Sequence, residues 1–221
     1  HEVNVSWAFY INHKIIAAIS DFKEYGLHQH ATLFVVEEDQ QRTRLVHYDN
    51  SYGASLGSDC IQQFGTAVKA YNDKIYFSCT DENDGCLKCF DEHGQLQRLS
   101  GYHGGIEDFE VTDEGIVFIG LRDQKLQEIY FLQNEAETQL THFNSEYHAA
   151  TAVSPIEKIE FYNDGIRHEG FVIKPADFDI NKKYPGILEI HGGPKGTFGP
   201  VINHEMQVFA ANGYFVFYCN P

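Results

Sequence analysis

The sequence has no long apolar run. No stretch approaches the roughly 20 apolar residues that a membrane-spanning helix needs, and the first residues lack the basic and then apolar segment of a secretory signal. Basic residues are also scarce, because 16 Lys and Arg stand against 32 Asp and Glu, a formal net charge of −16. Nucleic acids are bound through basic faces. We therefore expect neither a membrane nor a nucleic acid as a partner.

Proline is absent from the first 154 residues, and all six prolines lie in the remainder. The acidity is equally uneven. Residues 1–152 carry 24 acidic and 10 basic side chains, a net charge of −14, whereas residues 153–221 carry 8 and 6, a net charge of −2. We predict a border near residues 151–155, with one domain over residues 1–152 and another over residues 153–221.

Cysteine is sparse and odd in number, whereas aromatic residues are frequent. The 17 Phe and 13 Tyr indicate a folded core rather than disorder. Five cysteines in a chain of this length favour reduced thiols and a cytoplasmic setting. Cys86 and Cys89 have the spacing of a zinc or redox pair, but positions i and i+3 of a strand face opposite sides and no second ligand pair follows. We expect no metal and no other cofactor.

The first 152 residues read as short β-strands that repeat with a period near 40. Ile75 aligns with Ile116 and Phe77 with Phe118, 41 residues apart. The same offset aligns further positions: Cys89-Phe90 with Tyr130-Phe131, Leu99-Ser100 with Leu140-Thr141, and Val68 with Phe109 and Ala150. A period of about 40 residues made of four short strands is the signature of a propeller blade.

An earlier unit over about residues 6–50, with a predicted hairpin turn at Asn12-His13, brings the count to three blades or nearly so. Residues 49–63 form a loop insertion whose role the sequence does not explain. Known propellers have about 4–8 blades, so three cannot close a ring, and we expect the missing blades to precede His1. Open strand edges invite pairing with another copy, which makes a homo-oligomer a possible arrangement.

The last third of the chain has the pattern of an α/β sheet. Residues 156–162 and 167–174 predict a hairpin about an Asn-Asp-Gly turn. Residues 186–190 are an apolar run typical of a strand buried on both faces. Asn203 can cap a helix over residues 204–211, and residues 214–219 form a second buried strand. Strand, glycine loop, helix and strand in this order begin an α/β sheet.

The loop between that first strand and the helix contains His191, Gly192, Gly193 and Pro194. Glycine leaves backbone N–H groups unobstructed, and donors at the carboxyl end of a strand can point at the oxyanion that forms in acyl transfer. The Gly193 N–H is the best candidate donor, and Gly192 is its neighbour. The alternative is a plain glycine turn that joins a strand to a helix.

Other motifs give weaker signals. The segment Gly53-Ala-Ser55-Leu-Gly57 fits G-x-S-x-G, but a nucleophile elbow needs a buried strand before it and a helix after it, and here the flanks read as loop. We interpret Ser55 as a loop serine. His103-Gly-Gly105 is interpreted as a turn between blade strands, and the acidic residues 107–114 as a solvated blade edge rather than a site for a peptide amino terminus.

Several short segments fall at consistent spacings: Lys183-Tyr-Pro, Ile187 to Pro194, His204-Glu205, Gly213-Tyr214 and Asn220-Pro221. They resemble the opening of the catalytic domain of the prolyl oligopeptidase family of serine peptidases, most closely its acylaminoacyl-peptidase-like branch. The match is specific over about residues 156–221 and looser upstream. The resemblance implies a fragment of mainly β fold, in which a partial β-propeller precedes the first strands and helix of an α/β-hydrolase domain.

The same resemblance implies that the intact protein hydrolyses short peptides by acyl-enzyme chemistry, with the propeller restricting access to the site. The nucleophile, its histidine and its aspartate should then lie beyond Pro221, and we expect residues 1–221 alone to be inactive. Two other functions remain open. One is a propeller binding module without catalysis, and the other is an esterase of the same fold.

Overall fold

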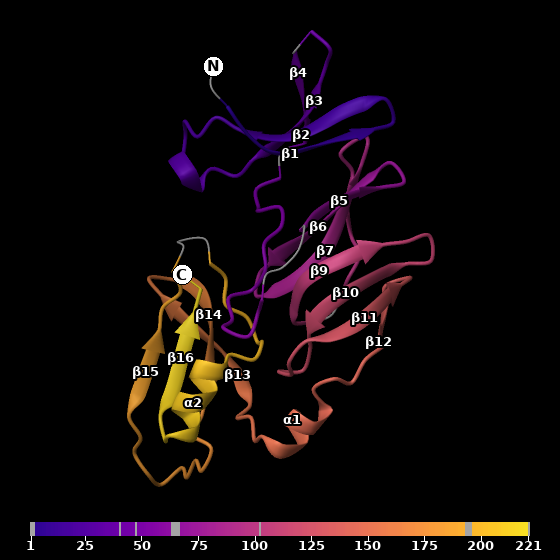
Figure 1. Cartoon of the computed structure of the whole chain (residues 1–221). Helices are drawn as coiled ribbons and strands as arrows, with labels where there is room; N and C mark the ends of the chain where they lie inside the picture. Colours follow the sequence, from indigo (N-terminus) through magenta and orange to yellow (C-terminus); the bar gives the residue numbers. More distant parts are fainter. Residues whose placement is uncertain are drawn as a thin grey trace.

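The computed structural model describes residues 3–39, 41–46, 48–62, 67–101, 103–192 and 196–220. These residues form four sheets of four strands each, two α-helices and one short 3-10 helix (Figure 1). The predicted fold class is confirmed. The chain is mainly β, with three sheets that make a partial propeller followed by one sheet that contains a parallel pair of strands.

Each of the first three sheets is a meander of consecutive antiparallel strands. The first contains β1 (Asn4–Ile11), β2 (Lys14–Ser20), β3 (Thr32–Val36) and β4 (Arg42–Val46), with the 3-10 helix η1 (Gly26–His28) before β3. The second contains β5 (Val68–Tyr71), β6 (Lys74–Asp81), β7 (Asp84–Asp91) and β8 (Leu96–Arg98). The third contains β9 (Gly105–Val111), β10 (Ile116–Leu121), β11 (Glu128–Gln133) and β12 (Ala136–Gln139).

The predicted turn between β1 and β2 is confirmed. Asn12 and His13 have φ values of 44° and 61°, and they join two strands that pair from Ile11 and Lys14 onward. Positive φ at both central residues is the geometry of a tight hairpin turn, and asparagine tolerates it better than most residues.

The 41-residue offset is confirmed in the first two strands of the second and third sheets. Val68 pairs with Phe77 in the second sheet, and Phe109 pairs with Phe118 in the third. All four side chains are buried. The blades therefore repeat the same inward-facing positions, as stacked units that bury their faces against neighbours require.

In these two sheets, hydroxyl groups at equivalent positions after the fourth strand accept hydrogen bonds from the third strand. The Ser100 hydroxyl accepts a hydrogen bond of 2.9 Å from the Leu87 N–H, and the Thr141 hydroxyl accepts one of 2.8 Å from the Ile129 N–H. This bears out the predicted alignment of the two hydroxyl positions. Each hydroxyl satisfies a backbone donor at the edge of its blade.

The predicted alignment of Cys89-Phe90 with Tyr130-Phe131 is wrong by one residue. Phe90 pairs with Ile75, and the residue that pairs with Ile116 is Leu132. The offset is therefore 42 residues in the third strand of the blade. The cause is the connection before it, because two residues join β6 to β7 whereas residues 122–127 join β10 to β11.

The repeat does not continue to Ala150, which the same offset placed in register with Phe109. Ala150 is the last residue of α1 (Ser145–Ala150), and no strand is assigned to residues 140–155 of the described chain. Alignment by offset fails here because a short segment of small and polar residues carries too little periodicity to separate a strand from a helix.

The chain is held as it leaves the third sheet by the buried carboxylate of Glu128. It accepts hydrogen bonds from the Thr141 hydroxyl at 2.6 Å and from the N–H groups of Phe143 and Asn144 at 3.0 and 2.8 Å. Burial alone would raise the pKa of the Glu128 carboxyl, but these bonds outweigh it and lower that pKa below its usual value.

We expect Glu128→Gln to reduce the acid sensitivity of folding. A carboxyl whose pKa is lower in the folded chain stabilises the fold above its unfolded pKa of about 4.3, and the stabilisation is lost as the pH falls through the folded value. The variant should lose about 1–3 kcal/mol of unfolding free energy at pH 7, and then lose less than the unsubstituted protein between pH 7 and pH 3. Thermal unfolding at both pH values measures this, and equal acid losses would contradict it.

The fourth sheet has the strand order β13-β14-β16-β15. Its strands are β13 (Ile156–Asn163), β14 (Ile166–Ile173), β15 (Gly186–Glu189) and β16 (Phe215–Cys219). The predicted hairpin of β13 and β14 is confirmed, with Asp164 and Gly165 at positive φ in its turn. β15 and β16 run parallel, and the predicted helix α2 (His204–Ala211) lies between them in the chain. The Asn203 side chain accepts a hydrogen bond of 3.0 Å from the Met206 N–H, as a capping residue does.

The expectation that residues 186–190 are buried on both faces is wrong. β15 is the edge of the fourth sheet, and among the described residues only β16 pairs with it. Leu188 is 57% exposed and Ile190 is 77% exposed. An apolar run shows that a strand can be covered, but the sequence cannot show which elements cover it.

Candidate functional site

The glycine loop, residues 191–198, follows β15. Of the predicted oxyanion residues, the structure describes His191 and Gly192, whereas Gly193 and Pro194 lie outside the described residues. The chain returns as Gly196–Phe198, called here the return arm. A Cβ atom on Gly196 would lie 2.7 Å from the Gly192 carbonyl oxygen and 3.1 Å from His191 Nδ1. The return arm therefore lies against the start of the loop, at a distance that only glycine permits.

The return arm is fixed by Asn220, which follows β16. The Phe198 N–H donates to Asn220 Oδ1 at 2.8 Å, and Asn220 Nδ2 donates to the Phe198 carbonyl at 2.8 Å. The Phe198 ring lies edge-on against His191 and Tyr218, with ring centroids 5.4 and 5.2 Å apart. The loop thus begins at the end of β15, and its return arm is bonded to Asn220 at the end of β16.

The described part of the loop insertion, residues 49–62, docks on the return arm and on the start of α2, a role that its sequence did not reveal. The Gly57 N–H donates to the Thr197 carbonyl at 2.7 Å, directly on the return arm. Asp59 accepts from the N–H groups of His204 and Glu205 at 2.6 and 2.8 Å. A carboxylate placed on the free donors of the first turn of α2 caps that helix from another part of the chain.

A pocket of about 570 Å³ opens beside the glycine loop. Three parts of the chain line it. The first contributes His30, before β3, with Asn50 and Ser51 of the loop insertion, and the second contributes the end of β6 and the β6–β7 turn with Thr80, Glu82 and Asn83. The third is β14 with the loops that follow β15 and β16: Ile166, Arg167, His168, Glu169, His191, Gly196, Thr197 and Asn220. A concave space in which polar groups from separate elements converge is the usual form of a small-ligand site.

Glu169 in this pocket is paired with two cations. The Lys158 ammonium lies 2.8 Å from Oε2 and the Arg167 guanidinium lies 2.5 Å from Oε1. These cations hold the pKa of the Glu169 carboxyl below its usual range. Glu169 therefore stays ionised at neutral pH and accepts hydrogen bonds from its neighbours.

One imidazole nitrogen of His191 has no partner among the described residues. Its Nδ1 lies 3.2 Å from the Gly192 carbonyl, while its Nε2 is buried and makes no hydrogen bond to any residue that the structure describes. Buried polar atoms are nearly always satisfied, by protein or by water. An unsatisfied nitrogen beside the pocket is a position at which a water molecule or a ligand group can bind.

Comparisons with known proteins agree with this geometry. No family model matches the chain. Over 120 residues, 52% of the chain, it is 34% identical to the uncharacterized peptidase YuxL of Bacillus subtilis, and over 66 residues it is 42% identical to a probable dipeptidyl-peptidase 5 of Aspergillus niger. The structure of an acylaminoacyl peptidase in complex with Z-Gly-Gly-Phe-chloromethyl ketone matches 94% of the chain with a TM-score of 0.74 and 25% identity. These relatives and structural neighbours are peptidases of the prolyl oligopeptidase family.

The chain spans only part of these family members: 18% of the Bacillus peptidase, 9% of the Aspergillus protein and 31% of the acylaminoacyl peptidase. A puromycin hydrolase structure matches 99% of the chain with a TM-score of 0.61 at 16% identity, which shows the shared fold alone. Among the described residues, neither α-helix has the length and apolar character that crossing a bilayer demands.

Ser55 lies in an irregular loop, without the strand before it or the helix after it that a nucleophile elbow needs. Its hydroxyl is buried and has no hydrogen-bond partner among the residues that the structure describes. A nucleophilic serine needs a base within hydrogen-bond reach. The geometry at Ser55 supplies none.

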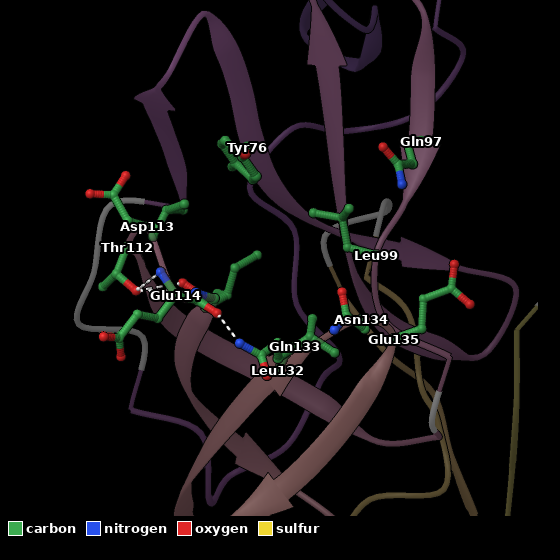
Figure 2. Close-up of a pocket in the computed structure, with 13 residues that line it drawn as sticks. Tyr76, Gln97, Leu99, Thr112, Asp113, Glu114, Leu132, Gln133, Asn134 and Glu135 are labelled. Carbon is green, nitrogen blue, oxygen red and sulfur yellow. Dashed lines mark hydrogen bonds between the residues drawn. The ribbon is translucent and has the colours of Figure 1, made fainter.

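A second pocket, of about 510 Å³, lies between the second and third sheets (Figure 2). In this view Asp113 and Glu114 stand on one rim, with Asn134 and Glu135 on the other. Its polar groups bond mainly to the protein, since Asp113 accepts from the Tyr71 hydroxyl at 2.7 Å and the Glu114 carbonyl accepts from Gln133 at 2.6 Å. We interpret this pocket as a seam between neighbouring blades.

The acidic residues 107–114 lie along and just beyond β9, an edge strand of the third sheet, and some of them also bond to other parts of the chain. Glu110 forms an ion pair of 2.7 Å with Lys69 of the second sheet, and Glu107 accepts hydrogen bonds from the Gln62 N–H and the Gln127 side chain. Glu110, Asp113 and Glu114 are exposed at the edge strand β9, as the sequence predicts, and the carboxylates of Glu107 and Glu110 in addition bond to neighbouring segments of the chain.

All five cysteines are free. Cys86 and Cys89 are both buried in β7, and Cys86 Sγ lies 3.2 Å from Cys79 Sγ on the neighbouring strand. In the described ranges no group of three or more His, Cys, Asp or Glu residues is placed to hold a metal ion. These thiols pack as small apolar side chains in the core of the second blade.

Sequence reasoning missed two residues of the pocket wall, Asn83 and Glu169, and the residue that caps α2 from the insertion, Asp59. Asn220 was noted only as part of a terminal Asn-Pro pair. None of them stands in a motif, because each acts on a residue far away in the chain. The one available signal was the unusual length of residues 49–63, which marked an insertion without showing its contacts.

Proposed function

We propose that this chain is part of a serine peptidase of the acylaminoacyl or oligopeptidase type, which hydrolyses short peptides by acyl-enzyme chemistry. In this proposal residues 1–152 belong to a propeller and residues 153–221 open the α/β-hydrolase domain. The observation that carries it is the His191–Gly192 loop at the end of β15, on the wall of a pocket shared by both parts. Support also comes from relatives that are described as peptidases.

In the proposed reaction, a serine hydroxyl attacks the peptide carbonyl, a histidine takes its proton and returns it to the leaving amine, and water then hydrolyses the acyl-enzyme. The N–H groups of Gly193 and Gly192 stabilise the oxyanion of each tetrahedral intermediate. Removing one such donor costs on the order of 10²–10³ in kcat. The nucleophile, acid and base lie outside these 221 residues, so the chain alone is inactive.

Assays of the full-length protein with two substrates, an acyl-amino-acid anilide and a p-nitrophenyl ester, test this proposal. We expect hydrolysis of an acyl-amino-acid anilide, blocked by a serine-directed fluorophosphonate. Hydrolysis of a p-nitrophenyl ester without the anilide would favour an esterase, and turnover of neither would favour a binding module. Residues 1–221 alone, assayed at the same concentration, should turn over neither substrate.

The proposal also covers the cellular location, the binding partners and the oligomeric state of the protein. The five free cysteines support a cytoplasmic protein. Short peptides are the proposed partners. The outer strand β1 presents Val5 and Tyr10, which are 51% and 70% exposed, so a second copy could pair with such an edge.

A further inference from the structure

The turn between β6 and β7 reaches from the second sheet into the fourth. Asn83, the second of its two residues, is only partly exposed. Its Nδ2 donates to Glu169 Oε2 at 2.5 Å, and its Oδ1 accepts from Asn220 Nδ2 at 2.7 Å. A Cβ atom on Gly199 would lie 2.3 Å from the Asn83 carbonyl oxygen, so the backbone of the turn also lies directly against Gly199, the residue that follows the return arm.

These contacts fix the orientation of two side-chain amides. The ionised Glu169 carboxylate can only accept, so it faces the NH₂ group of Asn83 and leaves the Asn83 oxygen toward Asn220. The Phe198 N–H can only donate, so it faces the oxygen of Asn220. The amide orientations that Glu169 and the Phe198 N–H each require are therefore compatible. With both set in this way, the hydrogen bond between Asn83 and Asn220 also has one donor and one acceptor.

The network ends on the glycine loop. Asn220 holds the Phe198 backbone through both its N–H and its carbonyl, and the Phe198 ring lies against His191. The return arm in turn lies against Gly192 through Gly196. A shift of Asn220 would therefore move Phe198, and with it the loop that carries the candidate oxyanion donors.

We propose that Asn83 is a positioning residue, which sets the glycine loop for catalysis from the propeller side through Asn220 and Phe198. The proposal rests on the proposed function, because it assumes that the loop binds the oxyanion. It assigns to the propeller a part in aligning the reacting groups, in addition to covering the pocket. Misplacement of a catalytic group by about 1 Å can cost 10²-fold in rate.

Steady-state kinetics of the full-length protein test whether Asn83 contributes to catalysis. We expect Asn83→Ala to lower kcat about tenfold with KM changed less than twofold, the loss expected when a transition-state donor is displaced and substrate binding is kept. Asn220→Ala should lower kcat by more, and the double variant should match Asn220→Ala alone, since residues in one network are not additive. Additive losses, or a rise in KM at constant kcat, would overturn the proposal.

Hydrogen exchange tests whether Asn83 positions the return arm, and it requires no peptidase activity. The Phe198 amide should exchange at least tenfold faster in Asn83→Ala and in Asn220→Ala, with β6 and β7 unchanged. Asn134→Ala, at the tip of the β11–β12 hairpin, is the matched control and should leave Phe198 unchanged. Asn83→Ser carries the same expectation if the alanine variant does not fold.

Together, the kinetic and hydrogen-exchange experiments distinguish a failure of the proposed function from a failure of the positioning role. Faster Phe198 exchange in a protein that hydrolyses neither test substrate would overturn the proposed function and leave the hydrogen-bond network standing. Unchanged exchange at Phe198 would overturn the positioning role of Asn83, whether or not the protein is a peptidase.

Discussion

Replacing Leu56 by alanine is expected to lower the free energy of unfolding by about 2–5 kcal/mol, the range found for truncating a buried leucine. Leu56 belongs to the loop insertion and is fully buried. It packs in one cluster with Leu121 of the third sheet and with Val201 and Ile202 of the segment before α2. The cavity would therefore open where propeller and fourth sheet meet. Chemical unfolding in urea, followed by circular dichroism, measures the loss.

The matched control is Leu27→Ala. Leu27 lies in η1 and is 83% exposed, so its truncation should change the unfolding free energy by less than about 0.5 kcal/mol. Similar losses at Leu56 and Leu27 would show that the insertion does not dock as described. A loss at Leu56 alone would show that residues 49–62 hold the two parts of the chain together.

Replacing Gly196 by alanine is expected to lower kcat/KM of the full-length protein by about 10²-fold, the size of the effect of misplacing a catalytic group. The added Cβ would lie 2.7 Å from the Gly192 carbonyl oxygen, closer than real Cβ atoms approach, and that oxygen belongs to the backbone rather than to the end of a flexible side chain. The return arm must then move away from Gly192. Steady-state kinetics on an acyl-amino-acid anilide measure the loss.

Gly186→Ala is the control for this variant. Gly186 begins β15, the same strand that leads into the loop, and a Cβ there would meet only the Phe215 carbonyl oxygen at 4.0 Å. Its kcat/KM should stay within about threefold of the unsubstituted value, since a change of 0.6 kcal/mol corresponds to that factor. If both variants lose activity equally, the close approach at Gly196 has no special importance.

Local features of this chain were predicted well from its sequence. The turn at Asn12-His13, the hairpin about Asp164-Gly165 and the cap at Asn203 all depend on residues within four positions of one another. Short-range chemistry of this kind is written directly in the sequence. The blade repeat was also visible, because Ile75 and Ile116 occupy the same buried position in two successive sheets.

Contacts between distant segments were not predictable in the same way. The capping of α2 by Asp59 and the hydrogen bond of Asn83 to Asn220 join residues more than 130 positions apart. Apart from the length of the insertion that contains Asp59, nothing near Asp59 or Asn83 in the sequence differs from an ordinary loop or hairpin turn. The exposure of Leu188 has the same origin, since an apolar strand pattern does not say whether it lies at the edge or the centre of a sheet.

The central claim is that the glycine loop binds the oxyanion of a peptidase reaction. A structure of the full-length protein with a peptide boronic acid bound to its nucleophile tests this most directly, because the tetrahedral boronate mimics the intermediate. We predict a boronate oxygen 2.7–3.1 Å from the N–H nitrogen of Gly193 or Gly192, the distance expected of an oxyanion-hole donor. A boronate that binds with its oxygens turned toward other donors, away from both glycines, would contradict the account.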